Sequence, residues 1–466
     1  MRKIITVLLT ALSSAAMTGQ TLTVEQCRQK ALEHNKKLEK VQCKVEQTHA
    51  DAAYYKANFF PKIDVLAGDM YSWGKTEMTL PMGEMAGNML SQIAPTLLQS
   101  GMMSQEALGA FSQIQIPDQE MDFKLKNTFF ASAVLTQPLY VGGKITAAYK
   151  MSRIGERMAR TNVRLTESEV IVETDEAYML VVKTQRLVKV ANSYKALLDE
   201  LQSNVDAAVK HGVRMSNDAL KVQVKRNEVE LNVVKAENAC SLAKMNLCQI
   251  IGEALNSDIS VEENNGSVSG LSTLINTGGN VDLSERPETD LLKGKTELAA
   301  ANVRIAASDY LPQVVLMGGY GYLNGMELNG QKLFDNGSPS VGVTVKIPVL
   351  EYFTQGRHKI NSAKAACRMA ELEREDSNER MMLESKQCEN NLSEAILEVQ
   401  LTAKSSEHAR RNMEMSKKQY EQGVETLSDY LDAQAMWQQA ECDRIEAEYK
   451  CFIANSKYLK SVGKLR

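Results

Sequence analysis

The stretch YEQGVETLSDYLDAQ, Tyr420 to Gln434, indicates how the whole chain is built. A long polar helical stretch is interrupted there at one glycine and resumes after a serine-aspartate pair. The stretch HGVRMSNDALKVQ, His211 to Gln223, has the same plan. In both, valine follows the glycine, an aspartate lies six residues after it, and a leucine lies two residues beyond the aspartate. Because glycine accepts the left-handed backbone at which helices end, each stretch predicts a tight turn between two antiparallel helices.

The sequence before each turn predicts a very long helix. No proline occurs from Gly143 to Lys210, a span on the order of 100 Å as a helix, and residues 357–422 repeat this. Return helices are expected over about 216–252 and 428–463. In the first long helix, apolar residues recur every seven positions, as in a coiled coil. They are Leu180, Leu187, Tyr194, Leu201 and Ala208, with Ala191, Leu198 and Val205 between them.

The chain is duplicated. Its two turn glycines, Gly212 and Gly423, are 211 residues apart. FFPKIDVL (59–66) matches YLPQVVLM (310–317), and VLTQPLYVGGK (134–144) resembles TVKIPVLEYFTQGR (344–357). The offsets leave about 41 extra residues in the first half. Prolines mark the four expected corners between strand and helix: Pro61, Pro138, Pro312 and Pro348.

Alternation with a period of two predicts strands between these prolines. In SVGVTVKIPV, Val341, Val343 and Val345 alternate with small or polar residues, which places apolar side chains on one face. Two pairs of strands of roughly 10 residues fit the dimensions of a membrane barrel; the alternative is the edge of a soluble sandwich. Four strands cannot close a membrane barrel, which needs at least about eight, so several copies would share one.

The N-terminus predicts export. MRKIITVLLTALSSAAMTGQ has two basic residues, an apolar run and then small residues, which is typical of a signal peptide cleaved between Ala16 and Gln20. The residues before Cys27 do not fit a lipid-modified terminus. No later stretch stays apolar for the roughly 18 residues of a spanning helix.

Composition narrows the class of protein. Proline is scarce (9) and aromatics are 6%, which favours long helices over several compact cores. The net charge is only −4, without a basic block, so no nucleic-acid partner is expected. The eight cysteines lie in helical text without paired short spacings, which favours buried small residues over a disulfide framework. They are Cys27, Cys43, Cys240, Cys248, Cys367, Cys388, Cys442 and Cys451.

Taken together, these segments resemble the TolC family of outer-membrane efflux conduits. LTVEQCRQKALEHNKKLEKV resembles the family's opening helix, and ERPETDLLKGKTELAAANVRIAASDYLPQV the start of its second half. QPLYVGGK resembles its strand-to-helix corner, and the two Gly-Val turns its periplasmic hairpin tips. The resemblance implies a mainly α fold with membrane β: a homotrimer in which each copy gives four strands to a twelve-stranded β-barrel, and whose helices form a long periplasmic α-barrel.

The expected organisation follows from the duplication and the resemblance. A signal peptide (1–19) precedes a first repeat (20–255), with strands at about 62–74 and 125–138, an extracellular insertion at about 76–122 and a tip near 212. A linker (256–280) leads to a second repeat (281–466), with strands at about 312–325 and 338–348 and a tip near 423.

Two interpretations of the tip aspartates stay open. Asp218 and Asp429 fall in the first turn of a helix, where a carboxylate favours the helix dipole by about 0.3–1 kcal/mol. The resemblance implies instead that Asp429 and Asp432 ring a closed periplasmic aperture, where three copies of each would attract cations. It also implies that Tyr420 helps to hold the tips shut and that Asp218 lies where a neighbouring tip is contacted.

The tips carry the other expected site residues. Ser216, and Thr426 or Ser428, are expected to cap the returning helices. The resemblance implies that an adaptor docks on the tips, at Gly212, Val213, Gly423 and Val424. Where the family's second tip can carry an arginine, this chain has Glu425, and the basic residue lies in the first tip as Arg214. A swapped Arg214–Glu425 contact between tips is therefore one hypothesis.

The predicted function is a passive outer-membrane exit duct rather than an enzyme. The sequence has no evident nucleophile-base arrangement, phosphate loop or zinc spacing, its five histidines are scattered through polar text, and no cofactor is expected. By resemblance, an inner-membrane RND or ABC pump supplies the energy through a periplasmic adaptor, the barrel contacts outer-membrane lipid, and the cargo is drugs, bile salts or other toxic small molecules. Alternatives are a type I secretion conduit for polypeptides and an exported coiled-coil scaffold.

The insertion is rich in methionine. Met78, Met82, Met85 and Met89 fall at helical spacing, with Met102 and Met103 beyond. Thioethers bind Cu(I) or Ag(I), so a heavy-metal conduit is one interpretation; flexible apolar packing in an extracellular loop that caps or narrows the outer mouth is the favoured one.

Overall fold

The computed structural model describes residues 21–71, 73, 75–99, 103, 105–114, 116–117, 119–262, 283–328, 331–332 and 336–465. The expected signal peptide and most of the expected linker lie outside these residues. The chain forms two compact units, a helical unit (1–52, 150–301 and 364–466) and a unit that contains the main sheet (53–149 and 302–363). Each unit draws on both halves of the sequence.

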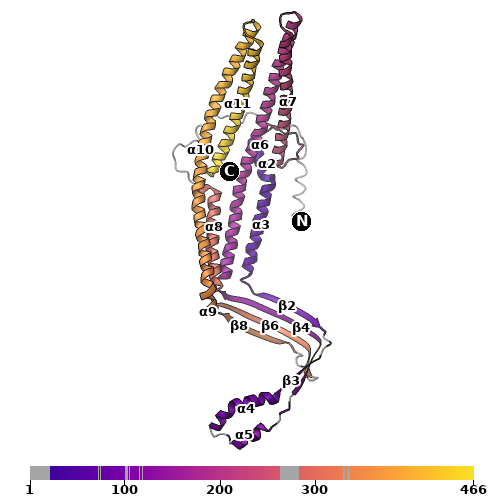
Figure 1. Cartoon of the computed structure of the whole chain (residues 1–466), viewed down its shortest axis with the longest axis vertical. Coiled ribbons are helices and arrows are strands. Elements are labelled where there is room, and N and C mark those ends of the chain that lie inside the picture. The colour runs from indigo at the N-terminus through magenta and orange to yellow at the C-terminus, as the bar shows by residue number, and fades with distance from the viewer. Residues whose placement is uncertain are drawn as a thin grey trace, which may run out of the picture. The chain divides into compact units, whose positions relative to one another are not determined.

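Long helices dominate the chain (Figure 1). Helix α6 has 67 residues and its counterpart α10 has 65, while the return helices α7 and α11 have 36 and 35. Figure 1 shows α6 beside α7 and α10 beside α11. Their bounds, with those of the shorter helices, are α2 Val24–His34, α3 Lys36–Ala57, α6 Lys144–Lys210, α7 Ser216–Ile251, η2 Leu283–Glu285, α8 Pro287–Ser308, α10 Arg357–Glu421 and α11 Leu427–Ser461.

The opening helix is secured to the helical unit at its N-terminal end. Thr23 caps α2 through a capping box with Gln26. A short parallel pair of strands, β1 (Thr21–Leu22) and β5 (Ser260–Val261), lies beside it. The buried Tyr178 hydroxyl of α6 donates to the carbonyls of Leu22 and Glu262, which secures both strands to the long helix.

A buried ion pair joins three helices. Arg28 of α2 makes a bidentate contact with the carboxylate of Asp175 on α6, at 2.7 and 2.8 Å. The Ser456 hydroxyl of α11 donates to the same carboxylate at 2.6 Å. Asp175 is fully buried, so removal of either partner would leave its charge under-solvated.

The predicted seven-residue pattern of α6 is confirmed near its C-terminal half. Tyr194, Leu198, Leu201 and Val205 are buried in a core shared by α7, α10 and α11. Leu187 is only half-buried. The eight cysteines are all free thiols, and Cys27, Cys248 and Cys451 are buried as small apolar residues, whereas Cys43 is exposed.

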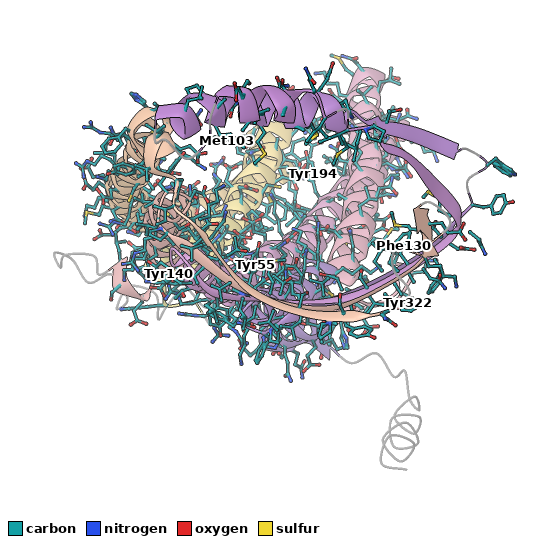
Figure 2. All side chains as sticks on the ribbon, turned by 90° about the horizontal axis from the view of Figure 1, so that it is seen from below. Tyr55, Met103, Phe130, Tyr140, Tyr194 and Tyr322 are labelled. Atoms are coloured by element: carbon teal, nitrogen blue, oxygen red, sulfur yellow. The ribbon has the colours of Figure 1, made fainter. Side chains whose placement is uncertain are left out.

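The second unit contains an antiparallel sheet with the main strand order β2-β4-β6-β8. The sheet is curved, with Phe130 of β4 and Tyr322 of β6 in adjacent strands (Figure 2). Its strands are β2 Lys62–Met70, β3 Lys75–Leu80, β4 Gln119–Val141, β6 Gln313–Leu328, β7 Gln331–Lys332 and β8 Ser338–Lys346. β4 is longer than the strand expected at 125–138, because β3, expected as part of the insertion, pairs with its first residues.

The register gives the sheet one apolar face. Directly paired residues point to the same side of a sheet. Val343 is paired with Leu316, and Ile63 with Leu135. The opposite face is richer in small and polar residues. The apolar residues of this face are Ile63, Val65, Ala67, Ala131, Ala133, Leu135, Val314, Leu316, Gly318, Tyr320, Tyr322, Val341, Val343 and Val345, and the register adds three polar ones, Asp69, Gln137 and Asn324.

The corner after β4 differs from the prediction. Pro138 lies inside β4, at a register shift between Pro138 and Tyr140, and not at the corner. The chain turns instead at Gly142 and Gly143, which have φ values of 63° and 79°. Pro61 and Pro312 directly precede β2 and β6, as expected, and Pro348 is the N-cap of the one-turn helix α9 (Val349–Glu351).

A π-helical turn, η3 (Tyr352–Gly356), connects α9 to α10. Asp309 joins this corner to the first one, since its carboxylate accepts from Lys144 at 2.8 Å and from Lys359 at 2.7 Å. These two hydrogen bonds are the main cause of the lowered pKa of Asp309.

The insertion holds two helices, α4 (Met82–Gln99, with Pro95 inside) and α5 (Gln105–Ser112). Among the helices of the described residues, none is both long and apolar enough to cross a membrane.

Candidate functional site

The two hairpin tips reverse in the same way. At the first, the Val213 amide donates to the carbonyl of Ala208 and the Gly212 amide to that of Val209. At the second, Val424 donates to Gln419 and Gly423 to Tyr420. This is the Schellman arrangement, which needs a left-handed residue after the helix; the two glycines have φ values of 72° and 76°.

Both tips expose a valine. Val213 is 75% exposed and Val424 is 74% exposed, at equivalent places in the two turns. The Schellman bonds fix the backbone on either side, so each valine is presented on a rigid turn. The two turns thus present the same apolar side chain at the same place.

The returning helices start differently. Thr426 caps α11 through a reciprocal capping box: the Asp429 amide donates to the Thr426 hydroxyl, and the Thr426 amide to the Asp429 carboxylate. Of the two caps expected here, Thr426 is therefore used and Ser428 is not. In the first tip the N-cap is Met215, without a side-chain cap, so the cap expected at Ser216 is wrong by one position.

An aromatic stack connects the two hairpins. The Arg214 guanidinium lies 4.7 Å from the ring centroid of Tyr420, and Tyr420 stacks on Tyr430 with centroids 5.4 Å apart. Burial raises the pKa of Tyr420, while the Arg214 charge opposes this shift. A cation over an aromatic face contributes about 0.5–1 kcal/mol at an exposed site. Arg214 of the first tip thereby contacts the second tip of the same chain.

Glu425 has a partner in its own hairpin. Its carboxylate accepts a short hydrogen bond from the Ser416 hydroxyl of α10. Within the protomer, Arg214 therefore lies on Tyr420 and Glu425 on Ser416, in place of a contact between Arg214 and Glu425.

The three tip aspartates occupy different surroundings. Asp429 and Asp432 are exposed and lie three residues apart, on one side of α11. Asp218 is half-buried, 4.0 Å from Lys221. Burial raises the pKa of Tyr194 to about 12, and the charges of Glu228 and Asp432 add to the shift. Both Asp429 and Asp432 thus present carboxylates to solvent, and that of Asp429 also accepts from the Thr426 amide.

The tip bundle has further links that the sequence did not reveal. Tyr430 is buried in the core beneath the tips, and Lys417 of α10 contacts Glu200 of α6 at 3.0 Å. Tyr420 and Tyr430 are ten residues apart, one on each side of the turn. This spacing could have predicted that their rings stack. Both contacts hold one hairpin against the other.

The described part of the chain holds no cluster of three histidine, cysteine or acidic side chains that could bind a metal ion. Of the five histidines, His49 lies 3.1 Å from the carboxylate of Glu156, an ion-pair position beside Arg153 and Arg160.

Comparison with known proteins gives outer-membrane efflux proteins and channels over most of the chain. The family model described as outer membrane efflux protein matches residues 27–253 and 283–463. The outer membrane protein TolC of Vibrio cholerae is 20% identical over 315 residues, covering 66% of this chain and 71% of that protein. Among solved structures, the outer-membrane channel OprN has a TM-score of 0.73 at 16% identity, covering 94% of this chain and 89% of its own. The CmeC outer membrane channel of Campylobacter jejuni has a TM-score of 0.70 at 16% identity, covering 98% and 91%.

Proposed function

The chain belongs to the outer membrane efflux protein family, and from this we propose that it is the exit duct of a tripartite efflux system. It is an outer-membrane protein with a TolC-like fold and a helical periplasmic domain. In the proposed role, three copies form one duct that passes small toxic molecules from the periplasm to the outside.

The sheet carries this proposal. Its four long strands leave β2 and β8 as open edges among the described residues, and one face is mostly apolar across all four strands. An open edge with unpaired backbone groups is unfavourable in a hydrocarbon layer. Three copies that join β8 of one to β2 of the next would remove every edge and present a continuous apolar outer face.

The helices fit the same arrangement. The two hairpins have nearly equal arms, 67 and 36 residues against 65 and 35. Six such hairpins from three copies would form a helical tube whose tips end at one level. Val213 and Val424 are the proposed contacts for a periplasmic adaptor, and an inner-membrane RND or ABC pump is the proposed source of energy.

The tips are the proposed gate. Asp429 and Asp432 from three copies would form acidic rings at the narrow end, and the Arg214–Tyr420 contact would hold the two tips of one copy together. Such rings concentrate cations. Replacing Asp429 and Asp432 by asparagine should therefore weaken block of the conductance by trivalent cations, whereas Asp51→Asn, an exposed acid on α3, should not. Unchanged block in the double variant would contradict the gate assignment.

The proposed function is tested by isolation and conductance. The full chain should be recovered from the outer-membrane fraction as a heat-sensitive trimer that conducts ions in planar bilayers. A deletion strain should accumulate dyes and bile salts. A detergent-free monomer without conductance would refute the proposal, while a conducting trimer whose loss blocks secretion of a polypeptide would favour the type I conduit.

A further inference from the structure

The insertion carries an apolar stripe that stays largely exposed among the described residues. Met82, Met85, Met89 and Ile93 follow one another at helical spacing on α4. They are 36%, 58%, 67% and 43% exposed. The neighbouring side of α4 is partly occupied, since Gly83, Gly87 and Leu90 line an apolar pocket of 270 Å³ with Ile114 and Ile116. Met89 and Ile93 border the same pocket and nevertheless stay exposed, whereas Met82 and Met85 lie outside it.

This small module cannot hide the stripe by itself. α4 has 18 residues and α5 has 8, and residues 75–124 contain no cysteine that could staple them. Helices this short are marginal alone in water, and so small a segment cannot build a closed core. A partner surface is therefore required for the exposed face of α4.

Charge argues against a lipid surface as that partner. Residues 76–123 contain six acidic residues and no lysine, arginine or histidine. Helices that lie on anionic headgroups are typically rich in lysine and arginine on their polar face. The stripe itself is uncharged, so copies of it can meet without a charge penalty.

The insertion lies at the edge of the sheet where, in the proposed trimer, a neighbouring copy with the same stripe is joined. It interrupts the strand that pairs with β4: β2 pairs with residues 128–136 of β4, and β3 with 119–124. β2 and β3 thus form one open edge of the sheet, at which the proposed trimer is joined, and α4 directly follows β3. The insertion extends from the end of β2 that lies away from the corner with α6, because Lys62 pairs with Thr136 and Met70 with Thr128.

We propose that the α4 helices of three copies pack against one another through Met82, Met85, Met89 and Ile93, and form an apolar constriction over the extracellular mouth. The inference rests on the proposed function, because it takes the trimer as given. Methionine side chains are flexible and repack readily, so the constriction can yield to cargo of different shapes.

The contact is tested by cysteine cross-linking in the full-length trimer. Met89→Cys should give disulfide-linked dimers on oxidation, well above the background of the parent with its native thiols. The matched control is Ser91→Cys, on the exposed opposite side of α4, which should stay at background. Equal yields at the two positions, in a protein that migrates as a trimer, would overturn the contact and leave the duct intact.

Conductance tests the constriction separately. Met85→Glu combined with Met89→Glu places like charges in the proposed contact, and single-channel conductance should rise, whereas Ser91→Glu should leave it unchanged. Unaltered conductance in the double variant would overturn the constriction. A parent that neither forms a trimer nor conducts would instead refute the proposed function.

A fluorophore attached to the new thiol of the Met89→Cys variant should not be quenched by lipid-borne quenchers, and strong quenching would overturn self-packing in favour of lipid.

Discussion

At the scale of single residues, the two tips differ in one helix cap. Thr426 and Met215 occupy the same place, three residues after the turn glycine, and Asp429 and Asp218 follow three residues later. Only the threonine can complete a capping box with its aspartate. The first tip therefore leaves backbone amides at the start of α7 without side-chain partners.

This difference predicts opposite effects of two substitutions. Thr426→Ala should destabilise the start of α11 by about 1 kcal/mol, and Met215→Thr should stabilise α7 by a similar amount through a new bond with Asp218. Hydrogen exchange of the amides at 216–218 and 427–429 measures both. Ser428→Ala is the control, because Ser428 does not cap the helix. Unaltered exchange in Thr426→Ala would show that the capping box contributes nothing.

The tip residues also show the limit of sequence reasoning. Gly212 and Gly423 were predictable, because a turn glycine followed by a capped helix is a local pattern. The contact of Arg214 with Tyr420 was not, because these residues are distant in sequence and meet only when the two hairpins pack. The resemblance suggested Glu425 as a partner of Arg214 in a contact between tips, whereas within the chain the Arg214 guanidinium lies over the aromatic face of Tyr420.

At the scale of elements, the corner between β4 and α6 depends on a close backbone approach. A Cβ on Gly142 would lie 2.5 Å from the carbonyl oxygen of Ser308, whereas a Cβ on Gly143 would meet nothing within 4 Å. Both residues have positive φ, so any other residue is strained at either position. Only Gly142 adds a steric clash to this strain.

Gly142→Ala should therefore be more damaging than Gly143→Ala. The strain alone costs on the order of 1 kcal/mol, and the clash with Ser308 forces the corner to open. The yield of folded protein and its thermal midpoint should fall much further for Gly142→Ala. Equal losses in the two variants would mean that strain alone governs this corner. Sequence alone indicated the corner but assigned it to Pro138, because a proline usually ends a strand, whereas a bulge accommodates it here.

The same corner should respond to acid through Asp309. Lys144 and Lys359 lower the pKa of its carboxyl in the folded chain. A carboxyl with a lowered pKa stabilises the folded chain at pH values above its pKa in the unfolded chain, which is about 3.9 for aspartate. This stabilisation is lost as the pH falls through the pKa of the carboxyl in the folded chain. Asp309→Asn should thus be less stable than the parent at neutral pH, with a difference that shrinks on acidification. Thermal unfolding from neutral pH to pH values below about 3.9 measures this, and a difference that does not change with pH would contradict the ion-pair role.

At the scale of the whole molecule, periodicity and duplication predicted more of the helices and strands than composition did. The period of two in SVGVTVKIPV predicted both the strand β8 and its apolar face, and the missing prolines predicted the length of α6 and α10. Strand β3 was missed because it has only six residues, KTEMTL, and because its Met78 also fits helical spacing with Met82. It becomes a strand only because β4 extends beside it. Local patterns therefore gave the elements, while pairing partners set their limits.

The apolar face of the sheet gives a test of the proposed assembly. Val343 lies on the apolar face, paired with Leu316, while the next residue, Thr344, lies on the opposite face beside Met317. If three copies join their sheets in the outer membrane, Val343→Lys places a charge in hydrocarbon, at a cost of about 2–4 kcal/mol near the bilayer midplane. Thr344→Lys places the same charge toward the water-filled interior and should be tolerated. The amount of heat-sensitive trimer in the outer-membrane fraction distinguishes the two, since both variants change the same strand by one lysine. Loss of trimer in Thr344→Lys, with normal assembly of Val343→Lys, would contradict the proposed arrangement. It would mean that the face carrying Thr344 contacts lipid and that the apolar face lines the interior.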